Sequence, residues 1–315
     1  MTKLRALVGL LFIAVLVYSG LWHTSGFQAE KDAAALFASW RDKGLRVDHG
    51  KIKLSGFPYR MIITVDGLRV RTRGPGLDLG AESISFISHL WTPGHWVADA
   101  TNVRLSAADE AIELRDGTVR GSYRLHDDGK AIIVIDSGST EDFALEKAPG
   151  IDEMTRLKNW QLFLRTDPTH VENESGLYEE RFLDFKVMLD GGAAQFETTG
   201  GIMGPIVKDW TTEELGAWRD AGGLLEIDDF SLGTTGGRMK GSASLTLDEV
   251  YRPLGTATVQ VAGGKALAST LAAVGLNGLA DAIGDDPKTL SLMAQMGTIS
   301  EGGTNLIALK QLIKD

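Results

Sequence analysis

The residues of this chain most capable of chemistry are its six histidines and the adjacent aspartates Asp127-Asp128 and Asp228-Asp229. His89 and His95 flank the segment 90–94, so their two imidazoles could meet and hold a metal ion. The alternative is that both histidines simply occupy a turn. No two histidines stand four residues apart with a glutamate between them, the helical pattern of many zinc enzymes. The spacing therefore favours turn histidines, and we predict no metal ligands.

Three further patterns resemble reactive sites only in part. Gly74, Gly76 and Gly80 have the spacing G-x-G-x-x-x-G, and no helix is expected after them, so they indicate a turn and not a nucleotide loop. The pair Asp127-Asp128 precedes a glycine and predicts a hairpin turn, and nothing sets Asp228-Asp229 across a cleft from a second acid. The chain has no G-x-S-x-G nucleophile motif. We expect no catalytic residues, no cofactor and no enzymatic activity.

Composition excludes several other classes. The chain has 315 residues, a formal net charge of -10 and no basic stripe, which argues against a nucleic-acid partner. Cysteine is absent, so disulfides, thiolate nucleophiles and lipid-modified cysteines are excluded. Its 38 glycines accompany an ordinary hydrophobic fraction of 43%, a combination that suggests many tight turns between short strands.

The N-terminus predicts a membrane anchor over residues 1–25. Lys3 and Arg5 precede an uncharged run from Ala6 to Trp22, and its 17 residues span roughly 25 Å as a helix. Tyr18 and Trp22 are placed to lie at the far interface, and the two cations keep the N-terminus in the cytoplasm. Residues 26–315 would then form an exported body. The alternative is a signal peptide cleaved near residues 24–26.

A helix is predicted after the anchor. Ala33, Leu36, Phe37 and Trp40 share one helical face, and Gly44 is the expected C-cap. We expect this face to pack on the following sheet, although a partner helix would also fit it.

The region from Leu45 to Leu145 alternates apolar and polar residues with period two, as in strands with one buried face. An Asp or Asn repeatedly shifts this alternation, as at Asp66-Gly67, Asn102, Asp116-Gly117 and Asp228-Asp229, which predicts turns or β-bulges. The fold class is therefore mainly β (β-rich α+β), with a long curved antiparallel sheet.

The second half repeats this pattern after a Pro-Gly break, and two halves would meet near residues 148–158. Thr211 with Glu214 predicts a capped helix that stops at Gly222-Gly223. Residues 265–283 and 289–296 predict a C-terminal helix pair, the second starting from an Asp286 cap with Pro287. The tail, residues 305–314, fits a strand or a helix.

A long sheet with one apolar face must cover that face. It can close as a flattened barrel or remain an open groove, and a groove beside a bilayer suits the acyl chains of phospholipid. The alternative is a filled core in an envelope scaffold without a ligand. Protein partners stay open.

Four stretches carry a resemblance to a known family: the anchor and the helix ending in Ser39-Trp40; the turn Gly56-Phe57-Pro58-Tyr59-Arg60; the turn containing Trp91 and Pro93; and the segment from Trp218 to Gly222-Gly223. In these the chain resembles the mainly alphaproteobacterial domain of unknown function 2125. That family implies no catalytic residues. Its strand pattern is similar to that of AsmA-like proteins, which are anchored in the inner membrane with an apolar periplasmic β groove for lipid.

Among these motifs, the turn 56–60 is interpreted as architecture. Pro58 cannot donate to a strand ladder and disfavours helix at Phe57, so the stretch predicts a corner between two strands. We expect Phe57 to plug the apolar face at this corner and Arg60 to point away from it.

Overall fold

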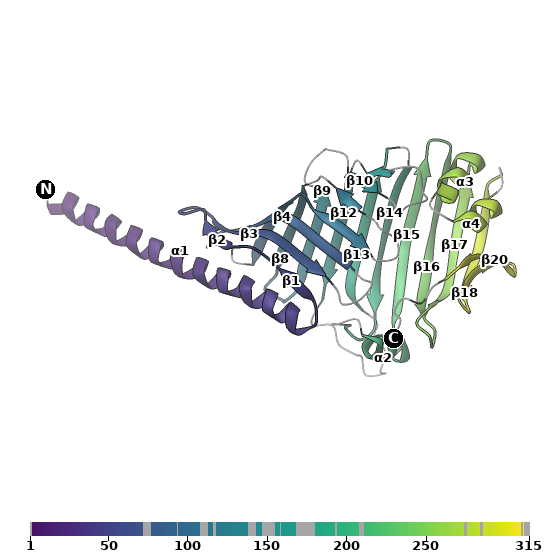
Figure 1. Cartoon of the computed structure of the whole chain (residues 1–315), viewed down its shortest axis with the longest axis horizontal. Coiled ribbons are helices and arrows are strands. Elements are labelled where there is room, and N and C mark those ends of the chain that lie inside the picture. Colours follow the sequence, from purple (N-terminus) through teal and green to yellow (C-terminus); the bar gives the residue numbers. More distant parts are fainter. Residues whose placement is uncertain are drawn as a thin grey trace. The chain divides into compact units, whose positions relative to one another are not determined.

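The computed structural model describes residues 2–71, 77–92, 94–107, 113–115, 118–137, 143–146, 155–157, 159–167, 180–192, 194–207, 211–273, 276–283, 286–309 and 311. The chain is mainly β, as predicted, with antiparallel strands, a long N-terminal helix and short helices in its second half (Figure 1). It divides into two compact units. Unit 1 comprises residues 1–124 and 135–156, and unit 2 comprises residues 125–134 and 157–315.

Unit 1 combines one helix with a strongly paired antiparallel sheet. Strand β3 pairs with β1, β2 and β4, strand β4 pairs also with β5 and β6, and β5 pairs with β8. The elements are α1 (Thr2–Asp42), β1 (Arg46–Asp48), β2 (Ile52–Ser55), β3 (Met61–Arg71), β4 (Leu77–Ser88), β5 (His95–Thr101), β6 (Arg104–Ala107) and β8 (Val119–Leu125). A separate small sheet contains β7 (Glu113–Arg115), β10 (Phe143–Glu146) and β11 (Thr155–Leu157).

The anchor and the following helix are one element, which corrects the prediction of two. Helix α1 runs without a break through 41 residues, because none of them is a proline. Its predicted end is confirmed: Gly44 has φ 91, its N–H donates to Arg41, and the N–H of Leu45 donates to Trp40. These two bonds form a Schellman motif.

The C-terminal part of α1 packs on the sheet of unit 1. Phe37 is buried with Val47, Val65 and Leu68, and Trp40 lies against this cluster. The predicted packing role of the helical face is therefore confirmed for Phe37 and Trp40, whereas Leu36 is 48% exposed. Figure 1 shows the N-terminal half of α1 extending beyond this sheet.

Unit 2 contains the first part of β9 and an antiparallel meander from β12 to β20. Strand β9 pairs with β12, each strand from β12 to β19 pairs with the next, and none of the described pairings joins β20 back to β9. The described strands of unit 2 therefore form an open sheet and do not close into the flattened barrel that was one of the two predicted forms. They are β9 (Ala131–Ser137), β12 (Asn159–Thr166), β13 (Arg181–Asp190), β14 (Ala194–Met203), β15 (Leu224–Thr234), β16 (Gly237–Leu247), β17 (Pro253–Ala262), β18 (Lys288–Gln295), β19 (Thr298–Glu301) and β20 (Thr304–Ala308).

Three short helices accompany this sheet: α2 (Thr212–Asp220), α3 (Gly264–Ala273) and α4 (Asn277–Ala282). The predicted cap of α2 is confirmed, because Thr211 Oγ1 accepts from the N–H of Glu214 at 3.2 Å. The predicted helix 265–283 is thus two helices, α3 and α4.

The predicted second helix, residues 289–296, is wrong, since residues 288–295 form β18. Leu290, Leu292 and Ala294 alternate as buried side chains and lie opposite β17, so pairing overrides the local helix-start signal at Asp286-Pro287. The ambiguous tail contains a strand, β20.

Two buried clusters stabilise unit 2. Helices α3 and α4 contribute Leu267, Leu271 and Leu279, which pack on Val259 and Leu290 of the sheet. Helix α2 contributes Leu215 and Trp218, which pack with Phe182 and Leu247. Burial of such aliphatic side chains contributes about 1.5–3 kcal/mol each.

One of the predicted bulges is found at Asp228-Asp229, where the register of β15 shifts against both β14 and β16. No bulge forms at Asp66-Gly67, because Asp66 and Leu68 pair with Ser83 and Ala81 of β4 in one unbroken register. The pair Asp127-Asp128 lies in the β8–β9 turn, whereas Asp116-Gly117 falls outside the described residues. Much of the predicted break at 148–158 is also outside them, so the meeting of two halves there stays a prediction.

Candidate functional site

The corner at residues 56–60 links β2 to β3, as predicted, and its backbone requires glycine. Gly56 has φ +97, and a Cβ added there would lie 2.6 Å from the carbonyl oxygen of Arg60. The N–H of Arg60 donates to the carbonyl of Gly56 at 3.0 Å and closes the corner. The peptide bond between Phe57 and Pro58 is cis.

This corner contacts α1 at the end of the apolar run. Trp22 Nε1 donates to the carbonyl of Arg60 at 3.0 Å, and the hydroxyl of Tyr18 donates to the carbonyl of Pro58. The prediction that Phe57 plugs the apolar face is wrong. Its ring is 49% exposed and lies edge-on to Trp22 at 5.3 Å, because the indole of Trp22 offers an aromatic partner outside the sheet. Arg60 is exposed, as predicted.

The turn after β4 lies at the same end of the sheet, because Ser88 pairs with Met61. Trp91 is 62% exposed, and its ring centroid lies 5.0 Å from that of His89. His95 Nε2 lies 3.3 Å from Ser122 Oγ, so the two histidines have different neighbours. Pro93 falls outside the described residues. Within the described part of the chain, no three potential ligands gather at a metal site.

The motif Trp218 to Gly223 has a structural role. Trp218 is 6% exposed and its Nε1 donates to the carbonyl of Met203 at 2.7 Å. The N–H groups of Gly222 and Gly223 donate to Arg219 and Trp218 in a second Schellman motif. A Cβ on Gly223 would lie 2.2 Å from the indole, so only glycine lets this ring close over the helix end.

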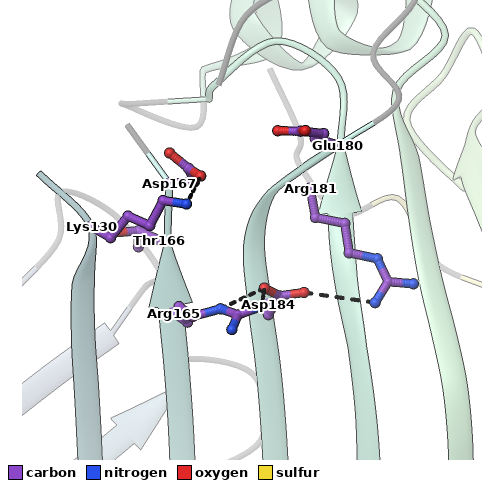
Figure 2. Close-up of a pocket in the computed structure, with 7 residues that line it drawn as sticks. All are labelled: Lys130, Arg165, Thr166, Asp167, Glu180, Arg181 and Asp184. Carbon is purple, nitrogen blue, oxygen red and sulfur yellow. Dashed lines mark hydrogen bonds and ion pairs between the residues drawn. The ribbon is translucent and has the colours of Figure 1, made fainter. Parts of the chain in front are cut away.

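A charged pocket of about 410 Å³ opens at the ends of β12 and β13 (Figure 2). Lys130 contacts Asp167 at 2.9 Å, and Arg165 contacts Asp184 at 2.7 Å. The pocket is lined by Lys130, Arg165, Thr166, Asp167, Glu180, Arg181 and Asp184. Each of the three cations that line it contacts a carboxylate, so an anionic ligand would have to displace these pairs.

Arg181 also reaches past β14 to two carboxylates of β15. Its guanidinium contacts Glu226 and Asp228 at 2.6 Å each. The hydrogen bond from Arg181 lowers the pKa of Asp228, and the bond to Asp167 raises the pKa of Lys130. Both effects hold the charged forms in place, which is the behaviour of structural ion pairs.

One face of the unit 2 sheet is apolar along the paired strands, and we call it the apolar face. Leu162 lies opposite Val187, Leu164 opposite Phe185, and Leu189 opposite Phe196. On the other face Gln161 lies opposite Met188, Met188 lies opposite Glu197, and the half-buried Phe163 lies opposite Lys186. This period-two separation follows directly from the alternating sequence.

The helices cover this face unevenly. Under α3 and α4, Val259 and Leu290 are 2% and 0% exposed. On β12 to β15 the apolar residues of this face that are only half-buried and belong to none of the three buried clusters of described residues include Trp160, Leu162, Leu164, Phe185, Val187, Leu189, Phe196 and Ile227. They form the open part of the apolar face, and their alternation was visible in the sequence.

Phe185 lies flat against this surface. A Cβ added to Gly200, which pairs with Phe185, would lie 2.8 Å from the Phe185 ring. Phe230 has the same relation to Gly241 on the next pair of strands, at 3.0 Å. Each ring therefore fills the space above a glycine, which makes this part of the apolar face flat.

The family model described as "Uncharacterized protein conserved in bacteria (DUF2125)" matches residues 22–298. The chain belongs to the DUF2125 family. No curated protein and no solved structure matches the chain.

The DUF2125 match confirms the family that the motifs suggested. It spans the corner at 56–60, the turn at Trp91 and the motif from Trp218 to Gly223. The similarity to AsmA-like proteins remains a prediction. The DUF2125 chain thus offers three features for a functional hypothesis: an apolar helix, a corner that contacts it, and a partly open apolar face.

Proposed function

We propose that this protein is a single-pass inner-membrane protein whose periplasmic body binds the acyl chains of phospholipid, without chemistry, on the open part of the apolar face. The observation that carries the proposal is the set of half-buried apolar side chains on β12 to β15. Apolar ligands bind to such surfaces because the contact removes apolar area from water, at roughly 25 cal/mol per Å².

The N-terminal helix supports the membrane part of the proposal. A helix of this length and composition fits a single-pass anchor or a signal sequence. Retention is favoured because α1 continues as a helix through residues 24–26, and because Tyr18 and Trp22 bond to the corner of the body. The positive charges of Lys3 and Arg5 favour a cytoplasmic N-terminus.

The test uses the full-length chain in vesicles that contain a phosphatidylcholine with a photoreactive acyl chain. After irradiation, peptide mass spectrometry locates the lipid adducts. We expect adducts on α1, as an internal positive control, and on residues 160–164 and 185–189. Adducts on α1 alone would refute acyl-chain binding and would favour the filled-core scaffold.

A matched pair of variants sharpens this test. The double variant Leu162→Gln with Val187→Gln places two amides at one cross-strand pair of the apolar face. Met188→Gln makes the same change at the neighbouring residue, which is 39% exposed and lies on the other face. The adducts on β12 and β13 should disappear in the first variant and persist in the second. Equal loss in both would show that the adducts report general exposure.

A further inference from the structure

Three exposed aromatic side chains gather at one end of the unit 1 sheet. Phe57, Tyr59 and Trp91 are 49%, 74% and 62% exposed. They belong to the corner before β3 and the turn after β4, which adjoin through the pair Met61 and Ser88. These large aromatic side chains expose apolar area to water, and such exposed patches mark interaction sites, so we expect a partner for this end.

The same end is joined to α1 at a defined height. Its contacts are Tyr18 and Trp22, the last aromatic residues of the apolar run from Ala6 to Trp22. Side chains earlier in this run are exposed, with Leu10 at 67% and Leu11 at 65%. If lipid surrounds this run, then residue 22 and the corner bonded to it lie at the boundary between hydrocarbon and headgroups.

The charge of this end differs from that of the whole chain. Residues 54–64 and 85–98 contain no aspartate or glutamate, although the chain has a formal net charge of -10. Arg60 is exposed beside Tyr59, and His95 lies opposite Arg124 on β8. Two segments with aromatic rings, cations and no carboxylates of their own suit the headgroup layer of a bilayer that contains anionic phospholipid.

We propose that this end of unit 1 is a second membrane contact, in which Phe57, Tyr59 and Trp91 insert into the headgroup layer of the bilayer that α1 spans. The bonds from Tyr18 and Trp22 hold the corner against the helix, so the rings and the anchor contact the membrane together. The contact sets the height of the sheet end above the bilayer. It does not depend on a ligand at the apolar face.

The absence of cysteine makes the test direct, because each introduced cysteine carries the only spin label. Full-length chains with Tyr59→Cys or Trp91→Cys are labelled and reconstituted in vesicles of phosphatidylethanolamine and phosphatidylglycerol. Ile13→Cys, within the apolar run, reports insertion of the helix. Arg46→Cys is the matched control, because residue 46 is exposed and pairs with Arg71 at the opposite end of β3.

Collision of the label with oxygen and with a water-soluble nickel complex measures its depth. Labels at 59 and 91 should be less accessible to nickel and more accessible to oxygen than the label at 46, and should lie shallower than the label at 13. Labels at 59 and 91 that match position 46 would overturn the proposal. A label at 13 outside the hydrocarbon would overturn it as well, since the rings would then lack their reference membrane.

A second measurement keeps the native ring in place. Phospholipids brominated near the headgroup quench nearby tryptophan fluorescence, and the chain contains seven tryptophans. The native chain should be quenched more strongly than Trp91→Phe by the same vesicles. Identical fractional quenching in the two proteins would contradict the insertion of Trp91.

Discussion

Replacement of Gly56 by alanine tests the physical basis of the corner that joins the sheet of unit 1 to α1. Gly56 has φ +97, a conformation in which a side chain on an L-residue is strained, at a cost of about 1–2 kcal/mol. The new methyl group would also lie 2.6 Å from the carbonyl oxygen of Arg60 and 2.9 Å from Cγ1 of Ile62. Neither the carbonyl of Arg60 nor the side chain of Ile62 can move away without disturbing β3.

The displaced carbonyl has a further consequence. It is the acceptor of the hydrogen bond from Trp22, and loss of that bond adds about 1 kcal/mol. Together these effects predict a local destabilisation of about 2–4 kcal/mol. Hydrogen exchange of the amides in β2 and in the first half of β3 should then accelerate by about 30- to 700-fold, since 1.4 kcal/mol corresponds to a factor of ten.

Gly67→Ala is the matched control for this variant. Gly67 has φ +57 on the same strand system, and a Cβ added there would meet nothing within 4 Å. Only the backbone strain of about 1–2 kcal/mol remains in this case. Comparable acceleration in the two variants, or unchanged exchange in Gly56→Ala, would refute the argument that close contact at the corner requires glycine.

Three further predictions concern the motif at α2, the ion pair between Arg181 and Asp228, and the anchor. Trp218→Ala should destabilise unit 2 by about 3–5 kcal/mol because it removes a buried ring, and a melting temperature equal to that of the wild type would contradict this. Folding lowers the pKa of Asp228, so its ion pair contributes stability that is present above its unfolded pKa and lost as pH falls through its folded pKa. The free energy of unfolding, measured as pH is lowered, should show this loss, and the loss should be smaller in Arg181→Gln. Replacing Leu11 and Val15 with lysine costs roughly 2.5–3.5 kcal/mol per charge at the helix centre, so the protein should leave the membrane fraction or fail to be exported. An unchanged fractionation would refute the anchor.

The strand-rich fold was predictable because its signals are local. A strand with one buried face shows itself as period-two alternation, and Asp228-Asp229 marks a bulge by shifting the alternation. Gly44 and Gly222 are the positive-φ positions of two helix ends, where the sequence offered glycine at the expected place. These features depend on the backbone preferences of one or two residues.

The errors arose where contacts distant in sequence decide the outcome. Asp286-Pro287 is a valid helix start by itself, yet Leu290 and Leu292 become buried by pairing with β17, so the segment is a strand. The local sequence alone predicts that Phe57 plugs the apolar face at the corner. Its partner is Trp22, 35 residues earlier, and no local pattern connects the two.

The apolar character of the candidate site was predictable from the sequence, but its position in the sheet was not. The apolar residues of β12 and β13 were recognisable as one-sided strands. Which of them stay half-buried depends on where α2, α3 and α4 pack, and this is set by the clusters around Trp218 and Leu267. Sequence periodicity specifies the face of a strand, whereas coverage of that face is a tertiary property.

The arrangement of helices assigns the two proposed contacts with lipid to different units. In unit 1 the helix α1 itself covers apolar side chains such as Val65 and Leu68, so this unit meets lipid through the rings of its corner and turn. In unit 2 the apolar face of β12 to β15 has half-buried side chains, so acyl chains would bind there. The two contacts are separable by experiment. The variant with Leu162→Gln and Val187→Gln should lose lipid adducts on β12 and β13, while spin labels at positions 59 and 91 keep their depth. A change of depth in that variant would mean that one lipid-binding surface, and not two, governs how this body meets the membrane.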